Sequence, residues 1–323
     1  MKTIFVNICS YRDKLLAPTL ESLMQNESGR NKIVYGVFEQ TSLEDSLLKK
    51  CPHLLNDKSR VRYKRIDPEY SDGVVWARAI NAMQIYDEEF QYQIDSHMLF
   101  DKDWDHFLML DYMQGCKLAG HDKVLLTCGT KNFDLENSDN DKFKIKKYTL
   151  TEDISVELGY YQFDKNMRLH AHGPWIPARD VVGPSRHICA GNFFAPTKWI
   201  KEVGYNTNIY FEGEEQMLVI TSFLKGYSIY HMRKAKTYHY LRSANHESKQ
   251  TVNPVIDANR IRMNQNRSEK ELSDYIYSLD ENQLESFRKY SGVDYINRKL
   301  EERAISRHLK SQAENDWEVP NKE

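Results

Sequence analysis

Residues 90–104 read FQYQIDSHMLFDKDW, and the rest of the chain is organised around this stretch. Apolar and aromatic residues alternate with polar ones over residues 90–94, which is typical of a short strand entering a core. The strand is followed by Asp95, Ser96 and His97, and then by three apolar residues. A buried strand that ends in such side chains predicts a functional site at its carboxyl end.

Asp95 and His97 are two residues apart, so both side chains can reach one divalent cation. The small Ser96 between them leaves room for a diphosphate oxygen. A carboxylate with an imidazole suits Mn²⁺ or a similar borderline metal, whereas an all-oxygen site favours Mg²⁺ or Ca²⁺. A purely structural interpretation is also open, in which Asp95 caps a turn and His97 is a hydrogen-bonded core histidine.

The first hundred residues alternate between strand and helix patterns. Strands are predicted at residues 3–9, 32–40, 59–67 and 90–95, with helical segments between them. This alternation predicts an α/β fold with a mostly parallel, doubly wound sheet flanked by helices. Ligands bind beyond the carboxyl ends of the strands in such sheets. Polar residues follow three of these ends: Ser10, Tyr11 and Arg12 after the first strand, Glu39 in the second, and residues 95–97 after the fourth.

Composition excludes several classes of protein. The chain has 323 residues, enough for one large α/β domain and an appendage. Its 45 basic and 47 acidic residues give a formal net charge of −2, which argues against a dedicated nucleic-acid binder. No segment reaches about 18 consecutive apolar residues, so we expect a soluble, cytoplasmic protein without a transmembrane segment. Five cysteines without CxxC spacing indicate free thiols in a reducing compartment.

The second half of the sequence continues with strands and helices. We expect a helix at 103–120, strands at 123–130 and 236–242, a strand, turn and helix at 188–205, and an apolar helix that begins at Glu214 and Glu215. The simplest role of these two glutamates is to complement the helix dipole. Residues 131–160 are predicted to form an exposed excursion, and residues 168–180, which include Trp175, an irregular recognition loop.

After residue 243 the sequence becomes highly charged and helix-forming. We therefore predict a domain over residues 1–245 and a small helical C-terminal appendage over residues 246–323. The charge runs of the appendage are typical of solvated helix faces.

Seven motifs, in this order, resemble glycosyltransferases of the GT-A (Rossmann-like) type. They are IFVNICSYRD (4–13), GVFEQ (36–40), WARAINA (76–82), QIDSHMLF (93–100), CAGNFFA (189–195), FEGEEQML (211–218) and TYHY (237–240). The resemblance is closest to the N-acetylglucosaminyltransferase family that modifies hydroxyproline on a cytosolic, Skp-type ubiquitin-ligase subunit, together with its bacterial relatives. The mucin-type polypeptide N-acetylgalactosaminyltransferases are similar too, and share an Asp-x-His motif with a distant third histidine.

The resemblance implies a role for each matching residue. Asp95, His97 and His239 would hold Mn²⁺ (or Mg²⁺) and, through it, the diphosphate of a UDP-sugar. The remaining assignments are Ser10, Tyr11, Arg12 and Glu39 for the uridine, Arg78 near the nucleotide and the departing diphosphate, Gly191 and Asn192 beside the sugar, and Glu214 or Glu215 on its hydroxyls or on the acceptor. Apart from the resemblance, the composition of residues 168–180 predicts that Trp175 lines the substrate site. Ala79 replaces the Asn that relatives carry after the arginine.

The resemblance implies transfer of a sugar, in the first instance N-acetylglucosamine, to a hydroxyl on a protein or glycan acceptor. Related families retain the anomeric configuration, and a front-face displacement fits because no paired nucleophile and acid are evident. An inverting reaction would use Glu214 or Glu215 as general base. The alternatives are a metal-dependent phosphoester hydrolase and a catalytically silent sugar-binding relative. Donor sugar, acceptor and oligomeric state stay open.

Overall fold

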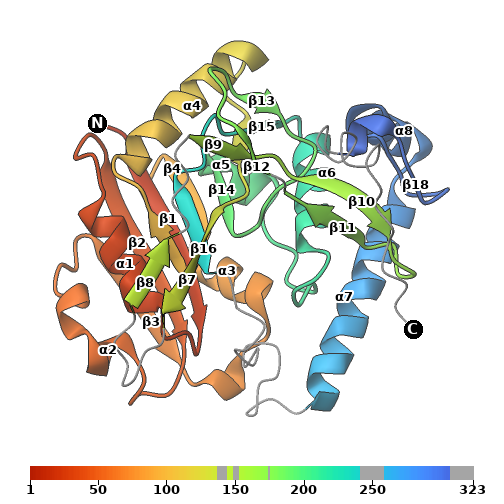
Figure 1. The fold of residues 1–323 in the computed structure, drawn as a ribbon. Helices are drawn as coiled ribbons and strands as arrows, with labels where there is room; N and C mark the ends of the chain where they lie inside the picture. Colours follow the sequence, from red (N-terminus) through yellow and green to blue (C-terminus); the bar gives the residue numbers. More distant parts are fainter. Residues whose placement is uncertain (137–143, 148–152, 174, 241–257, 306–323) are drawn as a thin grey trace.

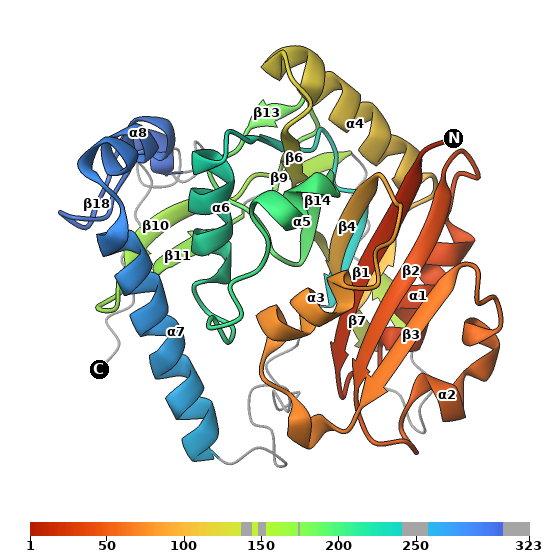
Figure 2. The same ribbon diagram turned by 180° about the vertical axis from the view of Figure 1, so that it is seen from behind.

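The computed structural model describes residues 1–136, 144–147, 153–173, 175–240 and 258–305. Its centre is an eight-stranded sheet with the strand order β13-β15-β6-β14-β4-β1-β2-β3 (Figures 1 and 2). The strands are β1 (Thr3–Tyr11), β2 (Lys32–Gln40), β3 (Val61–Ile66), β4 (Phe90–Asp95), β6 (Val124–Thr127), β13 (Gly183–Pro184), β14 (Asn192–Pro196) and β15 (Ser228–His231). Strands β1 to β4 run parallel, as do β6 and β15, whereas β14 and β13 are antiparallel to their neighbours. The predicted mostly parallel α/β sheet is confirmed.

Helices cover both faces of this sheet (Figures 1 and 2). They are α1 (Leu16–Gln25), α2 (Leu47–Lys50), α3 (Val74–Ala82), α4 (Trp104–Ala119), α5 (Lys198–Glu202) and α6 (Glu214–Leu224), with short 3₁₀ turns at Pro52–Leu55 and Pro68–Tyr70. Residues of α1, α2 and α4 share one core cluster, and residues of α3, α5 and α6 share another. Adjacent residues of one strand fall in different clusters, as Leu125 and Leu126 do. Burial on both faces explains the apolar runs in the sequence.

Smaller sheets occupy the region predicted to be an excursion and a loop. A four-stranded sheet has the order β5-β16-β7-β8, and two further pairs are β9 with β12 and β10 with β11. Their bounds are β5 (Met98–Phe100), β7 (Lys131–Glu136), β8 (Lys144–Lys147), β9 (Ile154–Val156), β10 (Gly159–Phe163), β11 (Leu169–His172), β12 (Trp175–Pro177) and β16 (Thr237–Tyr240).

Two predictions about this region are therefore wrong. Residues 131–136 are a strand, and residues 168–180 contain β11 and β12. The polar composition concealed the pairing of β7 with the distant β16, in which Lys131 lies opposite Tyr238. Phe133 is buried in a small cluster with Tyr238, and this contact holds β7 in place.

The C-terminal helices pack against the main body. They are α7 (Ala258–Ser278) and α8 (Glu281–Ser291), followed by β17 (Val293–Asp294), β18 (Lys299–Leu300) and a 3₁₀ turn at Glu302–Ala304. Leu272 and Phe287 are buried in the same cluster as residues of α6. The predicted helical character is confirmed for residues 258–278 and 281–291, and it is wrong for residues 293–300, where β17 and β18 pair instead. The boundary predicted after residue 245 lies outside the described residues and stays a prediction.

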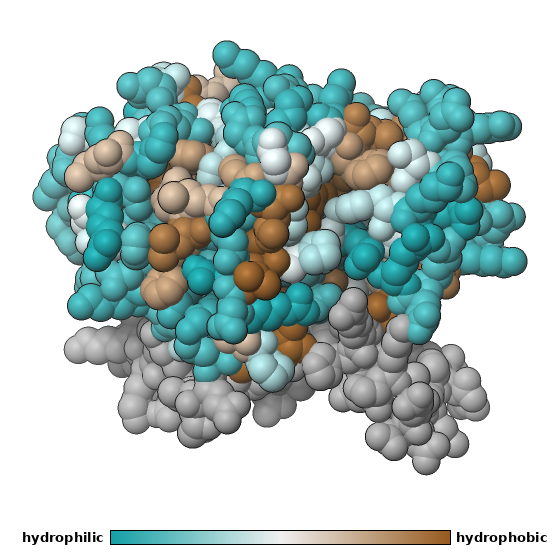
Figure 3. Space-filling view, turned by 90° about the horizontal axis from the view of Figure 1, so that it is seen from above, coloured by the Kyte–Doolittle hydropathy of each residue, from teal (hydrophilic) through white to brown (hydrophobic). Residues whose placement is uncertain are grey.

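The surface is mostly hydrophilic and the cysteines are unpaired, as the amino-acid composition indicates. In the view from above, hydrophilic side chains predominate, and hydrophobic ones lie between them in small groups (Figure 3). All five cysteines are free thiols, as predicted. Among the described residues, no helix combines the length and apolar character that crossing a membrane requires.

Candidate metal centre

Asp95 and His97 lie where β4 ends, beside the end of β1. The two strands are parallel, with Cys9 opposite Asp95. Asp95 is the last residue of β4, and the chain turns through Ser96 and His97 before β5 begins at Met98. The Ser96 carbonyl accepts a hydrogen bond from Thr19 Oγ1 (2.8 Å), which in turn accepts one from the Met98 N–H (3.0 Å). This turn is therefore fixed to α1.

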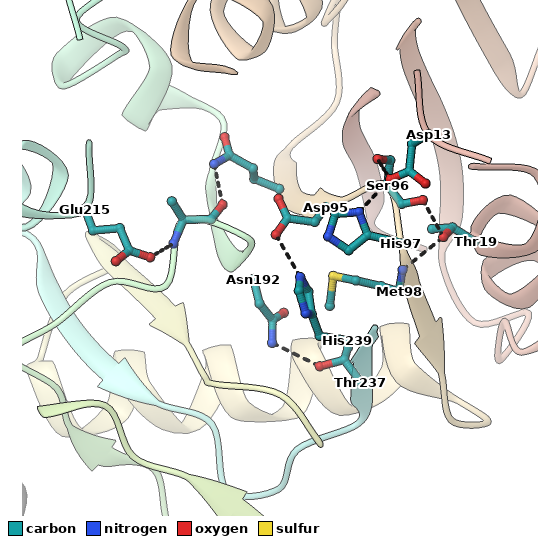
Figure 4. A network of polar contacts seen from close by, with 12 residues as sticks. Asp13, Thr19, Asp95, Ser96, His97, Met98, Asn192, Glu215, Thr237 and His239 are labelled. Carbon is teal, nitrogen blue, oxygen red and sulfur yellow. Dashed lines mark hydrogen bonds and ion pairs between the residues drawn. The ribbon is translucent and has the colours of Figure 1, made fainter. Parts of the chain in front are cut away.

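His239 belongs to β16, a strand that is far from β4 in the sequence. Its strand β16 is antiparallel to β5, with His239 opposite Met98. One ligand atom from each of Asp95, His97 and His239 lies within 4.8 Å of the others. The His239 Nε2 is 3.5 Å from Asp95 Oδ2, and the two imidazole centroids are 4.5 Å apart (Figure 4). The structure thus brings together the three residues predicted as metal ligands.

Arg78 of α3 joins Asp95 to Glu214 of α6. Its Nη2 donates to Asp95 Oδ1 (2.8 Å) and its Nη1 to Glu214 Oε2. The Arg78 side chain is 6% exposed. Burial opposes its charge, but the Glu214 and Asp95 carboxylates raise the pKa of Arg78 above its ordinary value. These bonds orient Asp95, and the predicted place of Arg78 near the nucleotide stays a prediction.

The electrostatics of Asp95 favour the ionised ligand. Burial opposes its charge, but the hydrogen bond with His239 and the positive charge of Arg78 hold the pKa of Asp95 well below its usual range. Gly191 packs directly against this carboxylate, and a Cβ at residue 191 would overlap Asp95 Oδ2. A glycine at residue 191 therefore leaves space for the Asp95 side chain.

The adjacent glutamates at the start of α6 have opposite environments. Glu214 is 4% exposed, and burial raises its pKa to about 7. Its Oε1 is buried without a hydrogen-bond partner among the described residues. The Glu215 side chain is 42% exposed, and its Oε1 accepts a hydrogen bond from the Ala190 N–H (2.9 Å). Glu215 is thus the member of the pair that can face a ligand.

Asn192 lies beneath the centre instead of facing it. Its Oδ1 accepts a hydrogen bond from the Tyr92 hydroxyl (2.7 Å), and its Nδ2 donates to Cys128 O (2.9 Å) and to Thr237 Oγ1 (3.1 Å). The side chain is almost fully buried. Figure 4 shows the bond to Thr237, which is on the strand that carries His239. The amide of Asn192 thus joins β14 to β16, and its predicted place beside the sugar stays a prediction.

The residues predicted to bind uridine lie at the ends of β1 and β2. Ser10 is buried, and the described residues give its hydroxyl no hydrogen-bond partner. Tyr11 is half-buried, and burial raises its pKa. Arg12 is exposed, with a left-handed φ of 48°, and its N–H donates to Gln40 O (3.0 Å).

Glu39 turns into the protein. Its Oε2 accepts hydrogen bonds from the Leu47 N–H (3.0 Å) and the Tyr63 hydroxyl (2.6 Å). Burial raises the pKa of Glu39. The carboxylate that was predicted to meet the ribose or base is therefore engaged at the start of α2.

Comparison with known proteins decides the family. A family model described as glycosyltransferase (GlcNAc) matches residues 3–59 and 49–290. The chain belongs to this glycosyltransferase family. A structure of GalNAc-T7 with UDP, GalNAc and Mn²⁺ is similar with a TM-score of 0.57 at 15% identity, over 89% of this chain and 54% of that chain. The family member described here thus spans about half the length of GalNAc-T7.

Other comparisons add less. A structure of Staphylococcus aureus TarS 1–349 with UDP-GlcNAc has a TM-score of 0.44 at 14% identity, over 94% of this chain and 83% of that chain. No curated protein matches the chain. The likeness to GalNAc-T7 shows the fold, so the GT-A architecture expected from the motifs is confirmed.

Family membership also bears on the alternative functions. A phosphoester hydrolase commonly bridges two metals. Among the residues that the structure describes, a single group of three potential ligands is found. Membership of a glycosyltransferase family favours glycosyl transfer over phosphoester hydrolysis. Trp175 forms part of β12, but its side chain lies outside the described structure, so its predicted role stays a prediction.

Two polar residues of the site were not predicted from the sequence. Asp13 Oδ2 lies 2.6 Å from His97 Nδ1, and His187 Nε2 lies 3.4 Å from Glu215 Oε2. Asp13 follows the end of β1, and parallel pairing of β1 with β4 brings that end beside Asp95. This pairing could have identified Asp13. His187 had no comparable signal, because it lies between β13 and β14 and its contact is with Glu215 of α6, which is distant in the sequence.

Proposed function

We propose that this protein transfers a sugar, N-acetylglucosamine, from a UDP-sugar to an acceptor hydroxyl on a protein or a glycan. One observation carries the proposal: Asp95, His97 and His239 converge at the carboxyl end of β4, in a chain of a glycosyltransferase family. GalNAc-T7, which has a similar fold, was solved with UDP, GalNAc and Mn²⁺. That composition supports a UDP-sugar donor and a divalent metal here.

The three ligands fit a divalent metal. One carboxylate and two imidazoles suit Mn²⁺ or a similar borderline ion better than Mg²⁺, which prefers oxygen ligands. The low pKa of Asp95 keeps its carboxylate ionised. A metal bound there would offset the negative charge that builds on a departing diphosphate.

Several side chains would orient the donor and the ligands. We assign the uridine end to the region where β1 and β2 end, with Ser10, Tyr11 and Arg12 nearest to it. Arg78 acts indirectly, because both of its terminal nitrogens already bind carboxylates. Glu215 and the backbone around Gly191 would border the sugar. Catalysis would then consist mainly of positioning and electrostatic stabilisation.

The stereochemistry follows from the role of Glu215. In a retaining front-face reaction, the diphosphate oxygen accepts the proton of the acceptor hydroxyl as the new glycosidic bond forms. In an inverting reaction, Glu215 would accept that proton. We propose the retaining course, as in the related families, because a front-face displacement needs no general base from the protein.

The test is release of UDP from a panel of UDP-sugars, with Mn²⁺ or with EDTA. Slow hydrolysis of the donor needs no identified acceptor, because water takes its place. The variants are Asp95→Ala and, as a matched control, Asp122→Ala, whose carboxylate is 75% exposed and paired with Lys198. NMR of the first sugar anomer formed reports the stereochemistry.

The proposal predicts Mn²⁺-dependent UDP release from UDP-N-acetylglucosamine, lost in Asp95→Ala and kept in Asp122→Ala. Release from another UDP-sugar alone would correct the donor. No release from any donor, together with no calorimetric binding of UDP plus Mn²⁺, would reject the transferase and favour a silent relative. The cytoplasmic location and the acceptor class remain predictions of the sequence.

A further inference from the structure

A buried carboxylate outside the ligand trio contacts the imidazole of His97. Asp13 Oδ2 lies 2.6 Å from His97 Nδ1 and also accepts a hydrogen bond from Ser96 Oγ (2.8 Å). Its other oxygen accepts the Leu15 N–H (2.9 Å) at the start of α1. The Asp13 side chain is 5% exposed. Asp13 is therefore anchored by the backbone and can act as a fixed acceptor.

The contact determines which nitrogen of His97 carries a proton. An ionised carboxylate only accepts hydrogen bonds, so the nitrogen facing it must be the donor. Asp13 also accepts hydrogen bonds from the Ser96 hydroxyl (2.8 Å) and the Leu15 N–H (2.9 Å), so its carboxylate acts as an acceptor on both oxygens. The proton of neutral His97 therefore lies on Nδ1, and Nε2 keeps its lone pair.

The position of the His97 imidazole directs Nε2 of this tautomer toward the other two candidate ligands. Figure 4 shows the His97 imidazole between Asp13 on one side and Asp95 and His239 on the other. Ligating histidines commonly donate their other N–H to a carboxylate, which fixes the tautomer and raises the basicity of the ligand. Thr19 holds the same turn from a second direction.

We propose that Asp13 is a positioning residue, which fixes the Nδ1–H tautomer of His97 so that Nε2 is available to a divalent metal. This inference rests on the proposed function for its metal, but its effect on His97 does not need the metal. The competing explanation is that Asp13 only caps the start of α1. The two differ in what an isosteric amide does at residue 13.

The informative variant is Asp13→Asn. Its side-chain oxygen can still accept from Leu15, but its amide can donate to His97 Nδ1 and so move the imidazole proton to Nε2. The matched control is Asp105→Asn. Asp105 is fully buried and accepts hydrogen bonds from Ser28 and Asn31, near the other end of α1.

Two measurements on the whole chain test the proposal. Mn²⁺ is titrated without donor and followed by EPR, and ¹⁵N–¹H correlation spectra of metal-free protein report the tautomer above the titration range of histidine. The chain has 11 histidines, so His97 is assigned by its absence from the spectrum of His97→Asn. We expect Asp13→Asn to weaken Mn²⁺ about 10- to 100-fold and to shift the tautomer. We expect Asp105→Asn to lower the melting temperature without changing Mn²⁺ affinity.

The contradicting results are equally specific. Unchanged Mn²⁺ affinity in Asp13→Asn would overturn the positioning role. If that variant does not fold, an Nε2–H tautomer in the wild-type protein would overturn it without any variant. A wild type with the Nδ1–H tautomer that binds no Mn²⁺ would instead reject the proposed metal centre and keep the contact as structural.

Discussion

The two halves of the molecule build the candidate centre in different ways. Strands β1 to β4 are parallel neighbours, so Asp95 and His97 arrive at an edge that also receives the end of β1. The second half consists of shorter strands, and it delivers His239 through β16, which pairs with β5. The first half supplies ligands from a regular frame, whereas the second half supplies one through a long-range pairing.

The halves also differ in how firmly they hold their ligands. The His97 side chain is 16% exposed and contacts Asp13, whereas the His239 side chain is 36% exposed. Arg78 of the first half and Glu214 of the second form a buried ion pair, one of the links between the halves beside the pairing of β4 with β14. This comparison suggests that the first half fixes the geometry and that the second half completes it.

The largest expected effect comes from breaking this ion pair. Replacing Arg78 by Met leaves the buried Glu214 without its cation, and Asp95 loses a hydrogen bond. Removing one partner of a buried ion pair costs about 3–5 kcal/mol in the free energy of unfolding. Denaturant unfolding measures it, with Arg30→Met as control because Arg30 is exposed.

A double variant sharpens that result. Adding Glu214→Gln to Arg78→Met removes the unpaired charge, so part of the lost stability should return. If Arg78→Met costs no more than Arg30→Met, the ion pair does not join the two halves energetically.

The next effect is a pH dependence due to Glu214. Burial raises its pKa from 4.5 to about 7, so the folded state binds this proton more tightly than the unfolded state. The stabilisation of the folded state by the Glu214 proton is fully present below the pKa of this glutamate in the unfolded chain. It is lost as the pH rises through the pKa of Glu214 in the folded protein. The loss is on the order of 3 kcal/mol.

Comparison with Glu214→Gln isolates this contribution. The stability of the wild type relative to the variant should fall between pH 4.5 and about 7, and stay constant above that range. Parallel pH profiles of the two proteins would show that the Glu214 proton is not bound more tightly on folding.

The smallest effect concerns the ligand from the second half. His239→Ala should weaken Mn²⁺ binding at least about tenfold, because even outer partners of metal ligands have effects of this size. The melting temperature should change little, since His239 is partly exposed. Titration calorimetry measures the affinity, with the exposed His121→Ala as control. Equal affinities in these two variants would remove His239 from the centre.

Much of the first half could be predicted from sequence, for a physical reason. Its strands are buried on both faces, so they appear as apolar runs, and functional residues follow where those runs end. Asp95 and His97 were found in this way. His239 was not marked by any local pattern, and only the family resemblance connected it with the other two residues.

Side-chain partners could not be predicted in the same way. Glu39 and Asn192 were assigned to the donor, yet their polar atoms bind groups inside the protein. Residues 131–136 read as exposed because most of them are polar, but they form a strand that pairs with β16 on one side and β8 on the other. These contacts join residues far apart in the chain, so no local spacing encodes them.

One measurement tests the central claim most directly, namely that both halves hold a single metal ion. Crystals of the protein grown with Mn²⁺ and UDP would be examined for anomalous scattering from manganese. The account predicts one strong peak within coordination distance of Asp95, His97 and His239, on the side of His97 away from Asp13. A peak bound elsewhere, or contacts to the first half alone without His239, would contradict it.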